Sequence, residues 1–242
     1  MTFVQSALPT KGPADLSTAV TPVIQCERIN TFRPPVHALR DVSVIIHQGI
    51  TCIVGPNGAG KTTLLKSIMG LLKVKSGRVT FRGREITGLP AHKIARLGIG
   101  YVPEDRRIYP DFSVRENILL STWRKKVRIE SIFDKVYALF PKLKDLDDAF
   151  GRGLSGGEQT MLAIARTLAL EPTCLLMDEP LEGLAPLVRH NLADGISELR
   201  SQDITTITTA SDMSYVPEIA NAIYTLERGE ITDRSEPPVE SG

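Results

Sequence analysis

A glycine-rich run in the first quarter of the chain constrains its fold more than any other feature. The run consists of Gly55, Pro56, Asn57, Gly58, Ala59, Gly60, Lys61, Thr62 and Thr63. It fits the pattern of a glycine, four residues of any kind and then Gly-Lys-Thr, which is typical of phosphate-binding loops. An apolar run typical of a buried strand precedes it, over 50–54, and a run of helical character, 62–69, follows it. The sequence therefore predicts a strand, a tight loop and a helix in direct succession, as α/β folds have.

The chemistry of such a loop is the capture of an anion. Its glycines let the backbone turn so that several N–H groups face one phosphate, and the N-terminus of the next helix adds roughly half a positive charge. We expect Lys61 to reach the β- and γ-phosphates of a nucleotide, Thr62 to bind Mg²⁺ and Thr63 to contact the α-phosphate. For this run alone, the alternative is a glycine-rich turn with a solvated lysine.

A second motif ends an apolar strand with two carboxylates. The run 173–177 leads directly into Asp178, Glu179 and Pro180. Because ligands of open α/β sheets bind beyond the carboxyl ends of the strands, we expect Asp178 to hold Mg²⁺ through water and Glu179 to polarise an attacking water. The alternative is a helix cap followed by proline, which these residues satisfy equally well.

A third motif, Leu-Ser-Gly-Gly-Glu-Gln over 154–159, lies about twenty residues before Asp178 and leads into an apolar helical run. Ser155 followed by Glu158 three residues later is a capping box that predicts a helix start. Gly156 and Gly157 leave backbone N–H groups of that start free to meet an anion. A helix cap alone is a locally sufficient alternative.

Short β-branched runs alternate with helical segments along most of the chain, which favours a mainly parallel sheet with helices on both faces. The predicted strands are 23–24, 42–46, 50–54, 78–81, 99–102, 173–177, 204–209 and 222–226, with a hairpin turn at Arg82-Gly83. The segment 113–146 is rich in charge, with apolar residues at helical spacing, and predicts a helical insertion. The domain prediction is a flexible leader over 1–22, one domain over 23–234 with a helical subdomain at about 112–166, and a loose tail over 235–242.

Composition excludes several other classes of protein. The formal net charge is +1, so no overall field attracts nucleic acid. Three scattered cysteines argue against a disulfide framework or a zinc site, and we interpret Cys52 and Cys174 as buried free thiols. No stretch approaches the roughly 18 apolar residues that span a bilayer. Any membrane role of this chain therefore needs partner proteins.

The three motifs together resemble the ATPases of ABC transporters, and the resemblance extends from Val23 to about Thr232. It is closest to the LivF type of branched-chain amino-acid importer ATPase, on the runs 102–107, 112–117 and 183–186. The resemblance implies a P-loop NTPase fold with a RecA-like core, an antiparallel β subdomain and an α-helical subdomain. It also implies hydrolysis of ATP with Mg²⁺, coupled to transport of branched-chain amino acids or similar small polar solutes.

The resemblance implies partners as well. Two ATPase subunits would face each other head to tail, so that Ser155, Gly156, Gly157 and Glu158 of one subunit meet the ATP of the other. Two integral-membrane permease subunits would hold the pair on the cytoplasmic face of a bacterial inner membrane, and an extracytoplasmic solute-binding protein would act indirectly. Other possibilities are a urea or amide importer, a lipid exporter ATPase, a regulatory nucleotide binder, a small-molecule kinase and a soluble ABC protein of DNA repair or translation.

This chain departs from the family pattern at several positions. Glu104 occupies the place of the Q-loop glutamine, which contacts Mg²⁺ and the water, and Ser211 takes the place of the switch histidine. Serine cannot carry the proton or charge that histidine carries near neutral pH. Leu181-Glu182 is unusual for the D-loop, and Phe32 resembles the aromatic residue that stacks on adenine, although a core or loop aromatic explains it as well. We therefore hypothesise that this chain's own site hydrolyses ATP slowly, which favours a heterodimer with a different ATPase.

Overall fold

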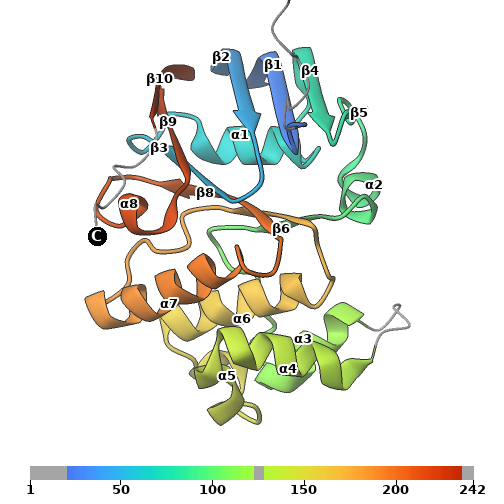
Figure 1. The fold of residues 1–242 in the computed structure, drawn as a ribbon, viewed down its shortest axis with the longest axis vertical. Helices are drawn as coiled ribbons and strands as arrows, with labels where there is room; N and C mark the ends of the chain where they lie inside the picture. The colour runs from blue at the N-terminus through green and yellow to red at the C-terminus, as the bar shows by residue number, and fades with distance from the viewer. Residues whose placement is uncertain (1–20, 123–127, 236–242) are drawn as a thin grey trace, which may run out of the picture.

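The antiparallel sheet forms the top of the molecule in the computed structural model, which describes residues 21–122 and 128–235 (Figure 1). Its strand order is β2-β1-β4-β5. The strands are β1 (Ile24–Arg33), β2 (Val36–Ile46), β4 (Val74–Phe81) and β5 (Arg84–Glu85). The predicted turn joins β4 to β5, where Phe81 pairs with Arg84. Arg82 and Gly83 both have positive φ, 48° and 75°, as the tightest hairpin turns require.

The second sheet contains the strand that leads into the phosphate loop and the strand that leads into Asp178 and Glu179. Its strand order is β10-β9-β3-β8-β7-β6. Its strands are β3 (Ile50–Val54), β6 (Ile99–Val102), β7 (Cys174–Met177), β8 (Thr205–Ala210), β9 (Ala222–Glu227) and β10 (Glu230–Ser235). All neighbours pair in parallel except β9 and β10. Every residue of β3 and β7 is buried, as expected for strands that are covered on both faces.

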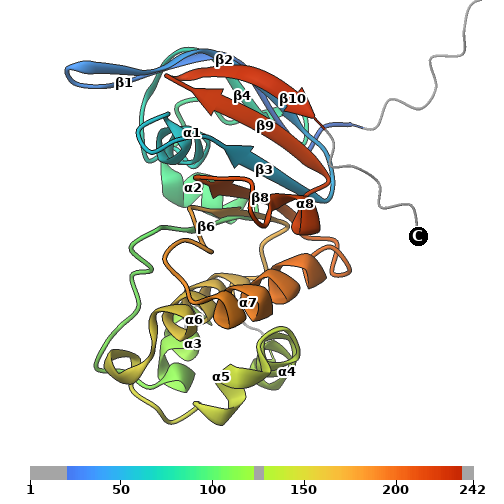
Figure 2. The ribbon, with the colours of Figure 1, turned by 90° about the vertical axis from the view of Figure 1, so that its left-hand side faces the viewer.

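Helices cover the parallel sheet on both faces. On one face, α1 (Lys61–Ile68) lies between the two sheets (Figures 1 and 2). One apolar core joins α1 to the antiparallel sheet and to β3, with Ile29, Ile53 and Leu64 fully or almost fully buried. The short helix α2 (Ala91–Arg96) contributes Ile94 to this core, whereas α8 (Val216–Ile219) packs on the opposite face of the parallel sheet, beside α7 (Pro186–Glu198). The antiparallel sheet therefore packs over the phosphate-loop helix.

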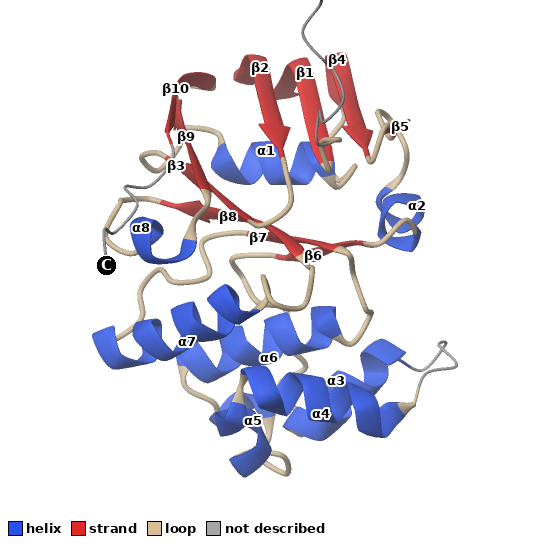
Figure 3. Ribbon diagram, viewed as in Figure 1, coloured by secondary structure: helices blue, strands red, loops and turns tan. Residues whose placement is uncertain are grey.

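The remaining helices gather on the opposite face (Figure 3). They are α3 (Val114–Thr122), α4 (Ile129–Leu139), α5 (Pro141–Asp145), α6 (Gly156–Leu168) and α7 (Pro186–Glu198), with a 3-10 turn, η1, at Gly151–Gly153. A second apolar core unites them with the sheet through residues such as Phe140, Leu162 and Leu175. Between Val114 and Leu168 the described chain is helical apart from connecting loops. The division of the chain into subdomains stays a prediction.

The sequence predicted most of the strands, but β1, β2 and β4 are longer in the structure than predicted. The strand β10 was not predicted, and it includes Ser235, the first residue of the predicted tail. Five of its six residues are exposed and charged or polar residues dominate it, so it lacks the alternation by which a half-buried strand is recognised. Residues 1–20 of the predicted leader (1–22) and residues 236–242 of the predicted tail (235–242) lie outside the described residues. Within the described residues, no helix is both long and apolar enough to cross a bilayer.

All three cysteines are free and buried, so we expect them to resist thiol reagents in the folded protein. Burial raises the pKa of the Cys26, Cys52 and Cys174 thiols to about 12. Because the thiolate is the nucleophile, we expect almost no reaction with an aromatic disulfide reagent at pH 8. In denaturant, the absorbance change should correspond to three thiols. Rapid labelling of the native protein would contradict the burial of these side chains.

Candidate functional site

The phosphate loop has the backbone that an anion-binding loop requires. It joins the end of β3 at Val54 to the start of α1 at Lys61. Gly58 and Gly60 have φ values of 83° and 114°, a region that residues with a side chain rarely adopt. At Gly60 a Cβ atom would also lie 2.9 Å from the Ala38 carbonyl oxygen. The loop therefore needs glycine here both for its conformation and for its close approach to β2.

Lys61 is held inside the loop by three oxygen atoms. Its side chain is 3% exposed, and its Nζ donates to the backbone carbonyls of Gly55 at 2.6 Å and Pro56 at 3.2 Å. The same Nζ lies 2.9 Å from Oε1 of Glu179, whose side chain is 9% exposed. The structure thus brings together the two residues that the sequence assigned to phosphate binding and to water activation.

Three hydroxyl groups surround the Asp178 carboxylate, which is itself buried. Oδ1 accepts hydrogen bonds from Thr62 at 3.0 Å and Thr209 at 3.1 Å, and Oδ2 accepts one from the Tyr101 phenol at 3.2 Å. Burial and the Asp178 charge raise the pKa of Tyr101, so the phenol keeps its proton and remains a donor. The contact between Thr62 and Asp178 brings together two of the predicted Mg²⁺ ligands beyond the carboxyl ends of the parallel strands β3 and β7, which β8 separates.

Glu179 is an acid in an unusual environment. Burial, together with a hydrogen bond to Glu182, raises its pKa to about 7 against the opposing effect of Lys61. The hydrogen bonds from Glu179 and Ser211 lower the pKa of Glu182, so Glu179 is the carboxyl group that carries the shared proton. Its pKa near neutrality suits a group that takes a proton from water.

Replacing Glu182 with glutamine is expected to shift the pH dependence of ATP hydrolysis. The negative charge of Glu182 and its hydrogen bond both raise the pKa of Glu179, and a glutamine removes the charge. Glu179 should then lose its proton at lower pH, which moves the acid limb of kcat/KM, a property of the free enzyme, to lower pH. Steady-state rates from pH 5.5 to 9 would check this, with Glu130→Gln as control, since Glu130 is exposed on a helix of the helical part and does not line the cleft. An unchanged or alkaline-shifted limb would contradict the prediction.

A cleft of about 770 Å³ opens beside the phosphate loop and has room for a nucleotide. Eight loop and acidic residues predicted from the sequence line it, together with residues of the β1–β2 hairpin and of the β9–β10 turn; the lining includes Asn57, Gly58, Gly60, Lys61, Thr62, Thr63, Glu104, Glu179, His37, Arg40 and Arg228. Gly55, Pro56 and Ala59 shape the loop without lining the cleft. Glu104 is exposed at its edge, where it can face a bound nucleotide.

Phe32 and Ser211 are predicted site residues that do not line the cleft. Phe32 is not among the lining residues, and its ring stacks on His37 with 4.1 Å between ring centroids. His37 itself lines the cleft, so a flat ring of this stack does face it. Ser211 lines a separate cavity of about 250 Å³ behind Glu179, and there its hydroxyl bonds Glu182. The side chain next to Glu179 in the cleft is therefore Glu182, which the sequence had marked only as unusual.

The third motif forms the start of α6, away from this cleft. Ser155 and Glu158 make the predicted capping box, with the Ser155 N–H donating to Glu158 at 2.8 Å. The segment after Glu104 reaches this helix, since Arg106 donates to Gln159 at 3.4 Å and its guanidinium packs against Gly156. Arg166, farther along α6, donates to the Arg107 carbonyl at 2.6 Å.

The donor set beside the loop suits Mg²⁺. Thr62 and Asp178 supply oxygen atoms at one point, and Mg²⁺ prefers oxygen ligands while retaining several waters and nucleotide phosphates. Among the described residues, no group of three or more His, Cys, Asp or Glu side chains comes together to hold a metal. A Mg²⁺ ion here would therefore depend on the nucleotide for part of its coordination.

Comparison with known proteins agrees with this geometry. The family model described as ABC transporter matches residues 39–182. The high-affinity branched-chain amino acid transport ATP-binding protein BraG of Pseudomonas aeruginosa is 36% identical over 86% of this chain and 91% of its own length. The lipopolysaccharide export ATP-binding protein LptB of Acidithiobacillus ferridurans is 33% identical over 82% of this chain and 84% of its own.

Solved structures show the same architecture. A nucleotide-free ATP-binding cassette from an ABC transporter superposes with a TM-score of 0.77 at 28% identity, covering 90% of this chain and 92% of that one. The cbiO1 protein of Clostridium perfringens, part of a transporter complex, has a TM-score of 0.80 at 26% identity, covering 90% and 89% of the two chains.

Proposed function

Because this chain belongs to the ABC transporter family, as an ATP-binding and ATP-hydrolysing subunit, we propose that it drives the import of branched-chain amino acids or similar small polar solutes. The observation that carries the ATPase assignment is the meeting of Lys61, Thr62, Asp178 and Glu179 at one end of the cleft. Support for the solute comes from BraG and from the probable LivF of Archaeoglobus fulgidus, both named for branched-chain amino acid transport; the latter is 34% identical over 86% of this chain.

Several residues in and beside the cleft have a proposed role in hydrolysis. The phosphate-loop N–H groups and Lys61 hold the phosphates, which releases Lys61 from Glu179. Thr62 and Asp178 would hold Mg²⁺, which neutralises charge on the β- and γ-phosphates when bound. Glu179 polarises the water that attacks the γ-phosphate, and Glu104 lines the same cleft. His37 and Phe32 offer the base a stacked pair of rings.

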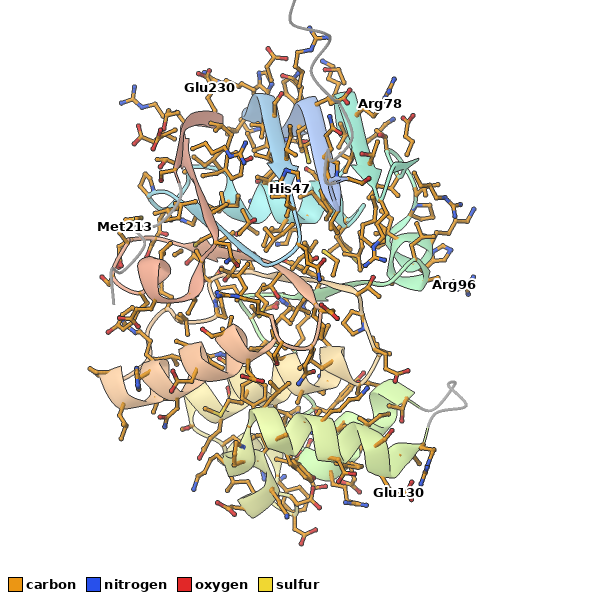
Figure 4. All side chains as sticks on the ribbon, viewed as in Figure 1. His47, Arg78, Arg96, Glu130, Met213 and Glu230 are labelled. Atoms are coloured by element: carbon orange, nitrogen blue, oxygen red, sulfur yellow. The ribbon has the colours of Figure 1, made fainter. Side chains whose placement is uncertain are left out.

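A second groove supports a permease partner and hence a position on the cytoplasmic face of the membrane. It measures about 560 Å³ and lies between α1, β6 and α6, with Met69 and the exposed Leu71 among its apolar residues. Four cationic side chains line it, from Lys66, Arg106, Arg107 and Arg166, and none of its described lining residues is acidic. Arg96 of α2, next to the lining residue Ala95, points outward (Figure 4). The groove fits an apolar segment that carries acidic residues.

A specific observation favours a second candidate, a mainly nucleotide-holding subunit in a heterodimer. Among the described residues, no histidine lines the cavity behind Glu179; Ser211 lines it and bonds Glu182 instead of facing the cleft. Such a site would bind ATP and turn over slowly, while the capped start of α6 completes the site of a different ATPase. Under this proposal the second ATPase and two permease subunits form the transporter, and a solute-binding protein acts through the permeases.

Co-expression with candidate permeases, a second ATPase and a solute-binding protein tests the proposal. We expect this chain to co-purify with the permeases, and vesicles that contain the complex to take up labelled leucine with ATP. Uptake of urea or of a lipid substrate in place of leucine would overturn the assigned solute. ATP turnover by the lone chain that rises with the square of its concentration would overturn the heterodimer in favour of a self-paired motor.

A further inference from the structure

Thr209 is a buried threonine near the end of β8, in a run of the chain rich in threonine. In the sheet, β8 lies between the phosphate-loop strand β3 and the acidic strand β7. The Thr209 Oγ1 lies 3.1 Å from Oδ1 of Asp178 and 2.8 Å from the backbone nitrogen of Glu179. We propose that Thr209 is a positioning residue, which fixes the Asp178 carboxylate and the Glu179 backbone through one hydroxyl group.

The direction of both hydrogen bonds follows from their partners. A threonine hydroxyl has one proton to donate and two lone pairs that accept. The Glu179 N–H can only donate, so it occupies a lone pair, and the single hydroxyl proton goes to the Asp178 carboxylate. An orientation of Thr209 that serves one of these residues therefore serves the other too. Threonine is stiff at χ1, which holds that orientation in the strand.

Thr209 is the donor on the buried side of Asp178. Its hydrogen bond is fully buried, whereas those from Thr62 and Tyr101 to the same carboxylate are only partly buried. Thr62 belongs to the cleft lining and is a proposed Mg²⁺ ligand itself, so its hydroxyl must serve the metal. Thr209 does not line the cleft and stays free to hold Oδ1. Hydrogen-bond partners that do not touch the metal themselves fix the orientation of its ligands.

The hydrogen bond from the Glu179 N–H to Thr209 supports an unusual backbone conformation at Glu179. Glu179 has a φ of 48°, a left-handed conformation that residues with a side chain seldom adopt. Such conformations persist only where the surroundings hold them, and they gather at functional sites. Thr209 supplies a partner for the N–H of this residue from a neighbouring strand. The direction in which the Glu179 side chain leaves the sheet thus depends on β8.

The test separates the hydroxyl from the packing of the side chain. Thr209→Val keeps the shape and removes the hydroxyl, and Thr209→Ser keeps the hydroxyl. Thr206→Val is the matched control, since Thr206 is buried in the same strand and its hydroxyl donates to the Ile204 carbonyl at 3.4 Å. For the full chain with ADP, Mn²⁺ affinity is measured by electron paramagnetic resonance, and ADP affinity in EDTA is measured with a fluorescent ADP.

We expect Thr209→Val to weaken Mn²⁺ binding by about 10- to 100-fold with ADP affinity in EDTA unchanged, and Thr209→Ser and Thr206→Val to match the wild type. Unchanged Mn²⁺ affinity in Thr209→Val overturns the inference, as does an equal loss in Thr209→Ser or an equal loss of ADP affinity in EDTA. If the valine variant does not fold, Thr209→Ser against Thr209→Ala gives the same comparison, because these two differ only by the hydroxyl.

The inference rests on the proposed role of Asp178 in holding the metal, and the two can fail separately. Asp178→Asn is measured in the same way. If Asp178→Asn leaves Mn²⁺ affinity unchanged, the proposed metal site itself is wrong. If Asp178→Asn weakens Mn²⁺ binding while Thr209→Val does not, the metal site stands and only the role of Thr209 is refuted.

Discussion

Replacement of Glu179 by glutamine is expected to lower Mg-ATP turnover at this chain's own site by about 10²- to 10⁴-fold, the usual contribution of a positioned general base. Glutamine keeps the length of the side chain and its place beside Lys61, but it cannot accept a proton from water. Nucleotide affinity should stay near that of the wild type, because the loop and Lys61 remain intact. Phosphate release and binding of a fluorescent ATP analogue measure the two effects separately.

Glu171→Gln is the matched control for this experiment. Glu171 is also a glutamate with left-handed backbone, φ 49°, but it is exposed and does not line the nucleotide cleft. Its replacement should leave turnover unchanged. Full activity of Glu179→Gln in the assembled transporter would mean that the partner's site performs all hydrolysis, as the nucleotide-holding alternative requires. Full activity in the lone chain would show that another residue polarises the water.

Replacement of Lys61 by methionine is expected to weaken ATP binding by roughly 10- to 150-fold. A hydrogen bond to a charged group contributes about 1.5–3 kcal/mol, and roughly 1.4 kcal/mol corresponds to a factor of ten in affinity. Lys61 is buried in the loop with its ammonium at the cleft, so methionine fills the space without the charge. Binding of the fluorescent ATP analogue at fixed Mg²⁺ measures the loss.

Lys66→Met is the control on the same helix. Lys66 lines the second groove, between α1, β6 and α6, and does not line the nucleotide cleft. Its replacement should therefore leave ATP affinity intact. An equal loss in both variants would indicate damage to α1 as a whole. Wild-type affinity in Lys61→Met would place the phosphates elsewhere in the cleft.

The sequence indicated the parts of the site that lie within continuous motifs. Gly55 to Thr63 and Asp178-Glu179 each follow a buried strand, and the carboxyl ends of parallel strands meet at one edge of a sheet. Their proximity could therefore be predicted without coordinates. The capping box at Ser155 could be predicted as well, because it depends on residues three positions apart.

The remaining contacts depend on how distant segments pack, which no local pattern records. Thr209 reaches Asp178 because β8 pairs with β7 in one register, and a shift by one residue would turn its side chain to the other face. His37 and Arg40 enter the cleft because the antiparallel sheet folds over α1. The pairing of Glu182 with Glu179 depends on the turn after Pro180. The only sequence signal for these residues was the odd composition around Glu182.

The helix α6 contacts the chain beyond Glu104 near both of its ends. Gln159, the last residue of the motif proposed to meet a neighbour's nucleotide, accepts a hydrogen bond from Arg106, and Arg166 near the other end of the helix donates one to the Arg107 carbonyl. A displacement of the loop that follows Glu104 would therefore move α6 as one rigid body. Within such an assembly, a change at one nucleotide would therefore be transmitted to the other through α6, a single helix of about three and a half turns.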